Sequence, residues 1–497
     1  MSFAPEDVQN YPIDLASLPQ GWKVTTIAEI AMAVEPGFPS GRHNQEGRGI
    51  PHLRPMNISR DGIVDLSEVK YVEGSPKAWL IDGDVLFNNT NSPELIGKTA
   101  LIRNPSNWAF SNHMTRIHPA PGISSAYLAH QLHYLWMSGY FRYRCVHHVN
   151  QASISSGPLA NTVPVVIAPT AEQERIVAAI EEQFSRLDAG VAVLERVREN
   201  LKRMQFAVLL AAVQGVLVPQ CADDEPAANM IAKVKTTTRF RGTQEPLDAS
   251  LGPLPPGWAW ARVGKLADRV TVGHVGPTKG KYVPQGIPFL RSQNVRPDSF
   301  DPTGLVWISP GFHKSLAKSI ISPGDVVIVR SGVNRGMACA VPEPLGEANC
   351  ADLVIVQKPS GIHPRFLCFF INSLARQYVQ SQQVGVAIPH FNTQSLSALP
   401  VPVPPLNEQF RIVEEADRIL SFTKRLTEII SGQIVRSKTL RSSVLMAAFS
   451  GRLALQDPSD EPASTLLERV DALRASSNGR SPRKSRQAPS VAGVSQA

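Results

Sequence analysis

A chain of 497 residues is long enough for about three domains, and its 43% hydrophobic and 19% charged residues exclude wholesale disorder. Its 50 Lys and Arg outnumber its 42 Asp and Glu, which gives a formal net charge of +8. That excess suits a polyanionic partner such as nucleic acid, although a mild basic balance does not establish one by itself.

The N-terminus and the cysteines indicate the compartment. The first residues lack the basic and apolar regions of a signal peptide, and no apolar run is long enough to span a membrane. The five cysteines never occur in a Cys-x-x-Cys spacing, so neither a disulfide scaffold nor a structural zinc site is expected. We therefore expect a cytoplasmic protein without a membrane segment.

The sequence contains two copies of one module. Residues 18–22 (LPQGW) return as 254–258 (LPPGW), and residues 172–177 (EQERIV) return as 408–413 (EQFRIV). Further matches lie between these in the same order. Because chance does not produce so many ordered matches, the protein is a tandem duplication.

Each copy begins with a part rich in Gly, Pro and Asn. Short apolar runs between turn residues, such as 84–87, 163–167 and 325–329, predict strands, and helices are expected at 125–137 and 364–380. The expected fold class is α+β, with two mixed α/β domains. The expected segments are an N-terminal extension (1–16), a first globular domain (17–168), a first long helix with the segment after it (169–234), a linker (235–252), a second globular domain (253–404), a second long helix with the segment after it (405–475) and a disordered basic tail (476–497).

A long helix follows each globular part. Apolar residues spaced by three, four and seven predict a heptad stripe in each copy. The stripes comprise Ile176, Ile180, Leu187, Val191, Leu194, Leu201, Met204 and Val208 in the first copy, and Ile412, Ala416, Ile419, Leu426, Ile430, Leu440 and Val444 in the second. Each helix would be roughly 60 Å long and cannot bury its stripe alone. We expect the two helices to pack as an antiparallel coiled coil with pseudo-two-fold symmetry; the alternative is that each packs on its own domain.

The sequence shows no pattern of a reaction centre. Gly97-Lys98-Thr99 resembles the end of a phosphate-binding loop, but Ser92 stands where the loop requires glycine. The histidines lack the spacing of a hydrolytic zinc site, and the nucleophile-elbow and dinucleotide-binding motifs are missing. We therefore expect a chain without catalytic activity.

Four motifs occur in the same order in both copies. They are Leu-Pro-x-Gly-Trp, Ile-Pro-x-Leu-Arg-x-x-Asn, Gly-Asp-Val, and a proline shortly before Glu-Gln-x-x-Ile-Val at the start of the long helix. This arrangement, over residues 17–470, resembles the specificity subunit of a Type I DNA restriction-modification system. The resemblance implies a non-catalytic scaffold with two target recognition domains, which read double-stranded DNA, and a helical spacer between two half-sites. A spacer of roughly 60 Å covers about 18 base pairs.

The resemblance also implies partners. Two modification (methyltransferase) subunits that use S-adenosylmethionine would dock on the scaffold, and restriction subunits would join that core to cleave DNA. S-adenosylmethionine, ATP and Mg are expected on these partners and no cofactor is expected in this chain. A structural adaptor whose duplicated domains bind proteins remains the alternative from a different class.

The duplication separates candidate DNA contacts from residues that serve the fold. If the two domains read different half-sites, base contacts should differ between the copies, whereas shared residues should serve the fold or contact phosphates. The shared polar pairs are Arg54 with Arg291 and Asn57 with Asn294. For these, loop anchoring and turn capping, phosphate contact and base contact all remain open.

The loop after Gly-Asp-Val differs between the copies. Because Asn can bond adenine and Arg can bond guanine, this loop is the best base-reading candidate, with a solvated hairpin tip as the alternative. Its candidates are Asn88, Asn89, Thr90 and Asn91 in the first copy, and Arg330, Ser331, Asn334 and Arg335 in the second. Divergent basic candidates elsewhere are Lys279 and Lys281 in the second copy, and Arg142 and Arg144 in the first. The last two flank Tyr143 and either grip phosphates or end a solvated helix. Because the candidate contacts differ between the two domains, we expect an asymmetric, bipartite DNA target.

Overall fold

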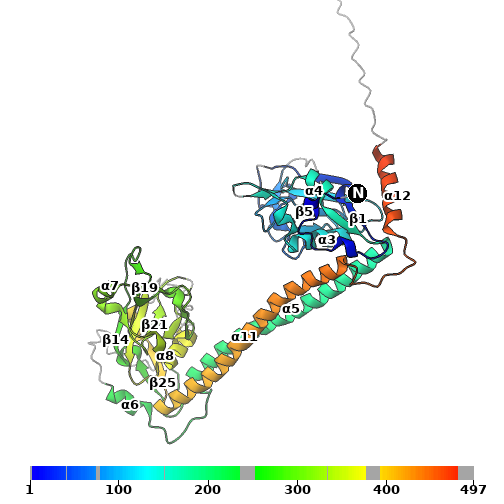
Figure 1. Ribbon diagram of the computed structural model, residues 1–497. Helices are drawn as coiled ribbons and strands as arrows, with labels where there is room; N and C mark the ends of the chain where they lie inside the picture. The colour runs from blue at the N-terminus through cyan, green and yellow to red at the C-terminus, as the bar shows by residue number, and fades with distance from the viewer. Residues whose placement is uncertain are drawn as a thin grey trace, which may run out of the picture. The chain divides into compact units, whose positions relative to one another are not determined.

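The computed structural model describes residues 3–40, 42–73, 79–149, 151–234, 252–332, 334–375 and 392–478. The chain divides into two compact units (Figure 1). Unit 1 comprises Met1–Val193 and Gln433–Ala497, and unit 2 comprises Leu194–Gly432. Almost all of the expected linker (235–252) and of the expected basic tail (476–497) lies outside the described residues.

Unit 1 is built around a four-stranded antiparallel sheet in the order β2-β9-β5-β7, against which helix α3 packs. Smaller sheets pair β1 with β12, β3 with β4 and β8, and β11 with β6 and β10. The strands are β1 (Lys23–Thr26), β2 (Ala31–Pro36), β3 (Ile50–Leu53), β4 (Lys70–Val72), β5 (Val85–Asn88), β6 (Thr90–Asn91), β7 (Thr99–Leu101), β8 (Ala109–Phe110), β9 (Met114–Pro119), β10 (Val146–His147), β11 (Ala152–Ser153) and β12 (Pro164–Ile167). The short helices are α1 (Pro5–Val8), α2 (Ile27–Ile30), α3 (Ser125–Met137), α4 (Ser156–Thr162) and α12 (Ala463–Asn478).

Unit 2 repeats this plan. Its four-stranded antiparallel sheet has the order β14-β24-β21-β22, and β13 pairs with β25 as β1 does with β12. The strands are β13 (Ala259–Arg262), β14 (Ala267–Val272), β15 (Tyr282–Val283), β16 (Ile287–Leu290), β17 (Val295–Arg296), β18 (Ser299–Phe300), β19 (Val306–Ile308), β20 (Ile320–Ile321), β21 (Val326–Val329), β22 (Ala338–Ala340), β23 (Ala348–Cys350), β24 (Leu353–Pro359) and β25 (Pro400–Val403). The short helices are α6 (Ala227–Lys233), α7 (Pro310–Ser315), α8 (Pro364–Phe370) and α10 (Thr393–Ala398).

The two long helices are α5 (Thr170–Val213) and α11 (Leu406–Phe449), each of 44 residues. In unit 1 the start of α5, with Ile176, shares a core with the end of α11, with Phe449. In unit 2 the end of α5, with Val213, shares a core with the start of α11, with Ile412. The α+β fold with two long packed helices is therefore confirmed, and in each unit the two helices run antiparallel (Figure 1).

Two predicted stripe positions are wrong. Met204 is 45% exposed and Leu440 is 44% exposed. Part of the contact between the two long helices is polar instead. In unit 2, Gln205 Nε2 donates to the buried Thr423 Oγ1 at 3.2 Å. In unit 1, Arg441 pairs with Asp188 across the helices.

Each globular core is completed by the other copy's helix. The core of unit 1 contains Leu445 and Phe449 from the end of α11 and Leu466 from α12. The core of unit 2 contains Val213 from the end of α5 and Ile231 from α6. Both alternatives considered for the long helices are thus partly right, since each helix begins in its own domain and ends in the domain of the other copy.

Candidate nucleic-acid interface

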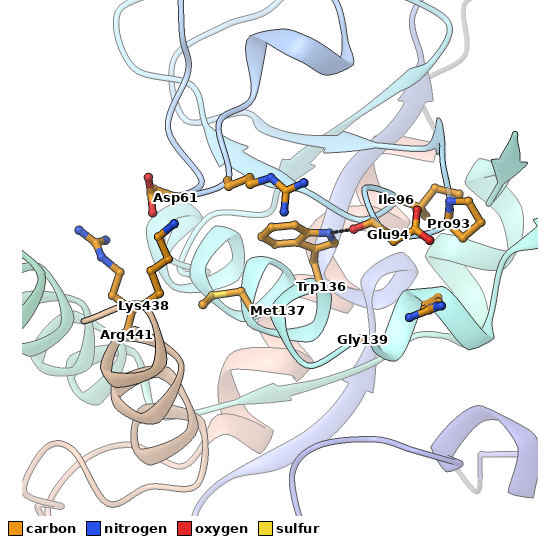
Figure 2. Close-up of a pocket in the computed structure, with 11 residues that line it drawn as sticks. Asp61, Pro93, Glu94, Ile96, Trp136, Met137, Gly139, Lys438 and Arg441 are labelled. Carbon is orange, nitrogen blue, oxygen red and sulfur yellow. Dashed lines mark hydrogen bonds between the residues drawn. The ribbon is translucent and has the colours of Figure 1, made fainter. Parts of the chain in front are cut away.

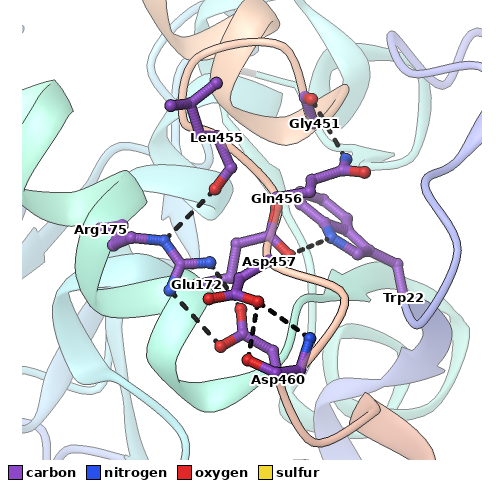
Figure 3. A network of polar contacts seen from close by, with 9 residues as sticks. Trp22, Glu172, Arg175, Gly451, Leu455, Gln456, Asp457 and Asp460 are labelled. Atoms are coloured by element: carbon purple, nitrogen blue, oxygen red, sulfur yellow. Dashed lines mark hydrogen bonds and ion pairs between the residues drawn. The ribbon is translucent and has the colours of Figure 1, made fainter.

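The motifs that the two copies share form the joint between each globular domain and its long helix. In unit 1, Trp22 Nε1 donates to Glu172 Oε2 at 2.9 Å, and Arg175 Nη2 pairs with Asp460 Oδ2 at 2.5 Å (Figure 3). Burial raises the pKa of the Glu172 carboxyl, against the opposing effect of the indole hydrogen bond.

Unit 2 repeats these two contacts. Trp258 Nε1 donates to Glu408 Oε1 at 3.1 Å, and Arg411 Nη2 pairs with Asp224 Oδ2 at 2.6 Å. Since Trp258 and Glu408 are buried and the side chain of Asp224 is only 6% exposed, these shared residues serve the fold.

The shared Asn residues also serve the fold. Asn57 Oδ1 accepts the backbone N–H of Arg54 at 3.0 Å, and its Nδ2 donates to the carbonyl of Asp65 at 2.9 Å. Asn294 repeats both bonds at 3.1 and 2.9 Å. Because both amides are buried and bonded, the alternative of a DNA contact by Asn57 or Asn294 is not supported, and turn capping accounts for them.

The two shared arginines are half-buried beside these turns. Burial lowers the pKa of Arg54. Arg291 Nη2 donates to the carbonyl of Gly304 at 2.6 Å, and its guanidinium lies 5.7 Å from the centre of the Tyr282 ring. Loop anchoring therefore accounts for Arg291, whose partly exposed head leaves a phosphate contact open.

The first-copy loop places two candidates in the core. Asn88 and Asn89 are buried; Asn88 Nδ2 donates to the carbonyl of Leu95 at 2.8 Å, and Asn89 Nδ2 to Thr115 Oγ1 at 2.9 Å. Their amides are used inside the protein, so we withdraw them as base-reading candidates. Thr90 and Asn91 follow on strand β6 and are half-exposed.

The second-copy loop remains nearer to solvent. Arg330 Nη1 lies 3.5 Å from Asp352 Oδ1, and Ser331 Oγ donates to Asp352 Oδ2 at 2.6 Å. Asn334 and Arg335 are half-exposed in the turn before β22. Asp352 therefore positions the first two side chains and partly offsets the charge of Arg330.

The small β10–β11–β6 sheet brings first-copy candidates together. Strand β11 pairs with β6, where Ala152 faces Asn91, and with β10, where Ala152 faces His147. The half-exposed strand β6 is therefore separated by one strand from β10. Arg142 is exposed just before β10, next to Tyr143, which is 70% exposed, and Val149 at the hairpin tip is 99% exposed. The sequence singled out Tyr143 between two arginines, whereas the exposure of Val149 could not be recognised from its residue type.

Arg144 does not belong to this surface. Its guanidinium pairs with Asp7 and donates to the carbonyl of Glu6, both in the N-terminal extension. The side chain is mostly buried, so Arg144 anchors the extension and its prediction as a phosphate contact is not supported.

In unit 2 a second exposed basic surface surrounds strand β15. Lys279 and Lys281 are exposed, and Lys281 Nζ lies 5.7 Å from the centre of the Phe312 ring. Tyr282 and Trp307, on the paired strands β15 and β19, are also exposed. Cations interleaved with aromatic side chains are typical of nucleic-acid surfaces.

The described residues contain no group of three or more His, Cys, Asp or Glu side chains that could hold a metal ion. The five cysteines are free thiols. Among the described helices, none combines the length and apolar composition that crossing a membrane requires.

Comparisons with known proteins agree with one another. A family model described as "Type I restriction modification DNA specificity domain" matches residues 276–435. The chain is 24% identical to the Type I restriction enzyme EcoBI specificity subunit of Escherichia coli, over 89% of this chain and 90% of that protein. It is 22% identical to the EcoKI specificity subunit of Escherichia coli strain K12, over 93% and 97%. A chain from a solved structure of a type I restriction-modification system is similar in fold, with a TM-score of 0.64 at 19% identity, over 88% of this chain and 99% of that chain.

Proposed function

Because the chain belongs to the specificity subunits of Type I restriction-modification systems, we propose that it reads an asymmetric, bipartite site on double-stranded DNA through two different surfaces. Such a subunit recognises the target sequence, has no catalytic activity and carries no cofactor of its own. Membership of this family favours DNA recognition over the structural adaptor that the sequence had left as the alternative.

The observation that carries the proposal is the contrast between the two copies. The joint residues, such as Trp22 with Glu172 and Trp258 with Glu408, are shared and buried. The exposed polar surfaces differ: unit 1 presents the β10–β11–β6 sheet, and unit 2 presents the region around β15. Two copies with one scaffold and two different surfaces suit two different half-sites.

We propose the partners that the family implies. Two modification subunits bind S-adenosylmethionine and methylate the site, and restriction subunits use ATP and Mg to cleave. We place this complex in the cytoplasm, since all five cysteines are free thiols.

The direct test is methylation profiling of the host genome with and without this gene. One bipartite motif, with two unlike halves, should lose its methylation when the gene is deleted. A genome whose methylation is unchanged, in a strain that expresses the modification subunits, contradicts the proposal.

Arg330 tests the assignment of unit 2. The variant Arg330→Ala should relax discrimination at one position of one half-site by roughly 1–3 kcal/mol, because Arg reads guanine with two hydrogen bonds. The matched control is Arg330→Lys, which keeps the charge but loses the paired donors. If the lysine variant behaves as wild type, or the alanine variant weakens binding equally on all sequences, Arg330 contacts phosphate.

A further inference from the structure

A pocket of about 390 Å³ opens in unit 1 between the globular domain and helix α11 (Figure 2). Trp136, at the end of α3, forms one wall, and Lys438 and Arg441 of α11 form another. The indole is held in place because Trp136 Nε1 donates to the carbonyl of Glu94 at 2.9 Å. Arg60 and Arg142 complete the basic lining.

The pocket carries an excess of positive charge. Its lining has the four cations just named against the two carboxylates of Asp61 and Glu94. The ion pairs found among the described residues include none made by Arg60, Arg142 or Lys438. Arg441 is partly neutralised, since it pairs with Asp188 and lies 4.6 Å from the centre of the Phe184 ring.

A buried lysine adds to this field. Lys98 Nζ donates to the carbonyls of Pro55, at 3.1 Å, and Ile58. Burial lowers the pKa of Lys98, and the nearby charge of Arg60 lowers it further. Three exposed cations in one concavity, with the charge of Lys98 near Arg60, favour an anionic ligand.

The second copy does not repeat the residues of this lining. The duplication aligns Lys438 and Arg441 with Lys202 and Gln205 on α5. Lys202 Nζ is neutralised by Glu199 Oε1 at 2.8 Å, and Gln205 is bonded to Thr423. The tryptophan of the wall, Trp136, aligns with Ala375.

The pocket continues the surface assigned to DNA in unit 1. Arg142 lies in the turn Tyr140–Tyr143 that leads into β10, and Glu94 belongs to the loop that leaves β6. A duplex on the β10–β11–β6 sheet would bring its backbone to this basic concavity. An acidic protein segment has no such continuity to support it.

We propose that this pocket binds a backbone phosphate of the DNA through Arg60, Arg142 and Lys438. Helix α11 then contacts DNA as well as supporting the recognition domain of unit 1. The inference rests on the proposed function. It assigns a sequence-independent contact to one half of the complex only.

The test uses the full chain assembled with its modification subunits and a random-sequence duplex, so that the target need not be known. Binding is measured by fluorescence anisotropy between about 50 and 200 mM salt. Each phosphate contact contributes about −0.9 to the slope of log K against log salt, so Lys438→Ala should lose about one unit of slope. Over this range the affinity of the variant should fall about 3-fold less than that of the wild type.

The matched control is Lys202→Ala, at the aligned position on α5 where the lysine is paired with Glu199. This control should keep the wild-type slope, and Arg142→Ala should behave as Lys438→Ala does. Equal slopes for Lys438→Ala and the wild type would overturn the inference. Loss of modification subunits from Lys438→Ala, with unchanged DNA binding, would overturn it too and assign the pocket to an acidic protein segment. If the wild type itself shows no salt-dependent binding, the proposed function has failed rather than the pocket alone.

Discussion

The last residue of α11 offers a sharp test of how the two copies complete each other's cores. Phe449 is fully buried in unit 1, where its ring lies 5.2 Å from that of Tyr127 and 6.2 Å from that of Tyr134. Replacing a buried Phe with Ala costs about 3–5 kcal/mol, from lost burial and the cavity left behind. We expect Phe449→Ala to destabilise unit 1 by this amount and to leave unit 2 unchanged.

Hydrogen exchange followed by mass spectrometry can measure the two units separately. At about 1.4 kcal/mol per tenfold change, exchange in α3 of unit 1 should quicken by about 100-fold or more, whereas β21 of unit 2 should keep its wild-type rate. The aligned variant Val213→Ala should do the reverse, at a smaller cost of about 2 kcal/mol. Met446→Ala, at an exposed position near Phe449, is the control and should change neither unit. If Phe449→Ala leaves exchange in α3 unchanged, the end of α11 is not part of that core.

Three further predictions concern two buried carboxyl groups and the accessibility of the cysteines. Trp258→Phe removes the donor to the buried Glu408 and should cost unit 2 about 1–3 kcal/mol in urea unfolding, most of which Glu408→Leu should recover in the double variant; no recovery would show that the hydrogen bond is not the cause. Burial raises the pKa of Glu172, so the stability linked to this carboxyl is present below its unfolded pKa and is lost as pH rises through its folded pKa. Glu172→Gln keeps an oxygen for Trp22 and should melt above the wild type near pH 8 but level with it near pH 4, and a constant difference would refute this. Cys221 is exposed whereas the other four thiols are buried, so alkylation with iodoacetamide, followed by intact mass, should add one group to the native chain and five after denaturation.

Most of the fold could be predicted from two features: the internal repeat, and the change in each copy from short apolar runs to a heptad stripe. The predicted apolar stripes, 176–208 and 412–444, both lie inside the long helices α5 and α11. The short apolar runs at 84–87 and 325–329 became β5 and β21, and the helix expected at 125–137 is α3. The helix expected at 364–380 starts as α8 and passes into a π-helical turn at Ile371–Ala375, and residues 376–380 are outside the described residues.

The closing of each core by the other copy's helix could not be predicted. Phe449 meets Tyr127, and Arg175 meets Asp460, across separations in sequence that no local pattern spans. Such contacts depend on how the chain returns after a whole second domain. Periodicity shows that a helix has an apolar face, but not which surface covers it.

Which of the candidate residues are exposed could not be predicted from the sequence. Asn88 follows three apolar residues, and strand β5 continues through it with all four positions buried. A buried amide that finds a carbonyl partner costs little, so a polar residue in a loop-like sequence can belong to the core. The pairing of Arg144 with Asp7 could not be predicted either, because its partner lies far away in sequence, in the N-terminal extension.

Divergence between the copies therefore marks a DNA contact only where the residue is also exposed. In unit 2, Arg365 pairs with Asp298 and with Asp417 of α11, and burial raises the pKa of Asp298 to about 6. The aligned residues of unit 1 include Ala126 and Glu181, which line a second pocket of about 600 Å³ where unit 2 has its ion pairs. These residues differ between the copies as much as the proposed DNA contacts do, yet they lie where the globular domain meets its helix. Because residues at this junction diverge as well, a residue is assigned to DNA only where it both differs between the copies and is exposed.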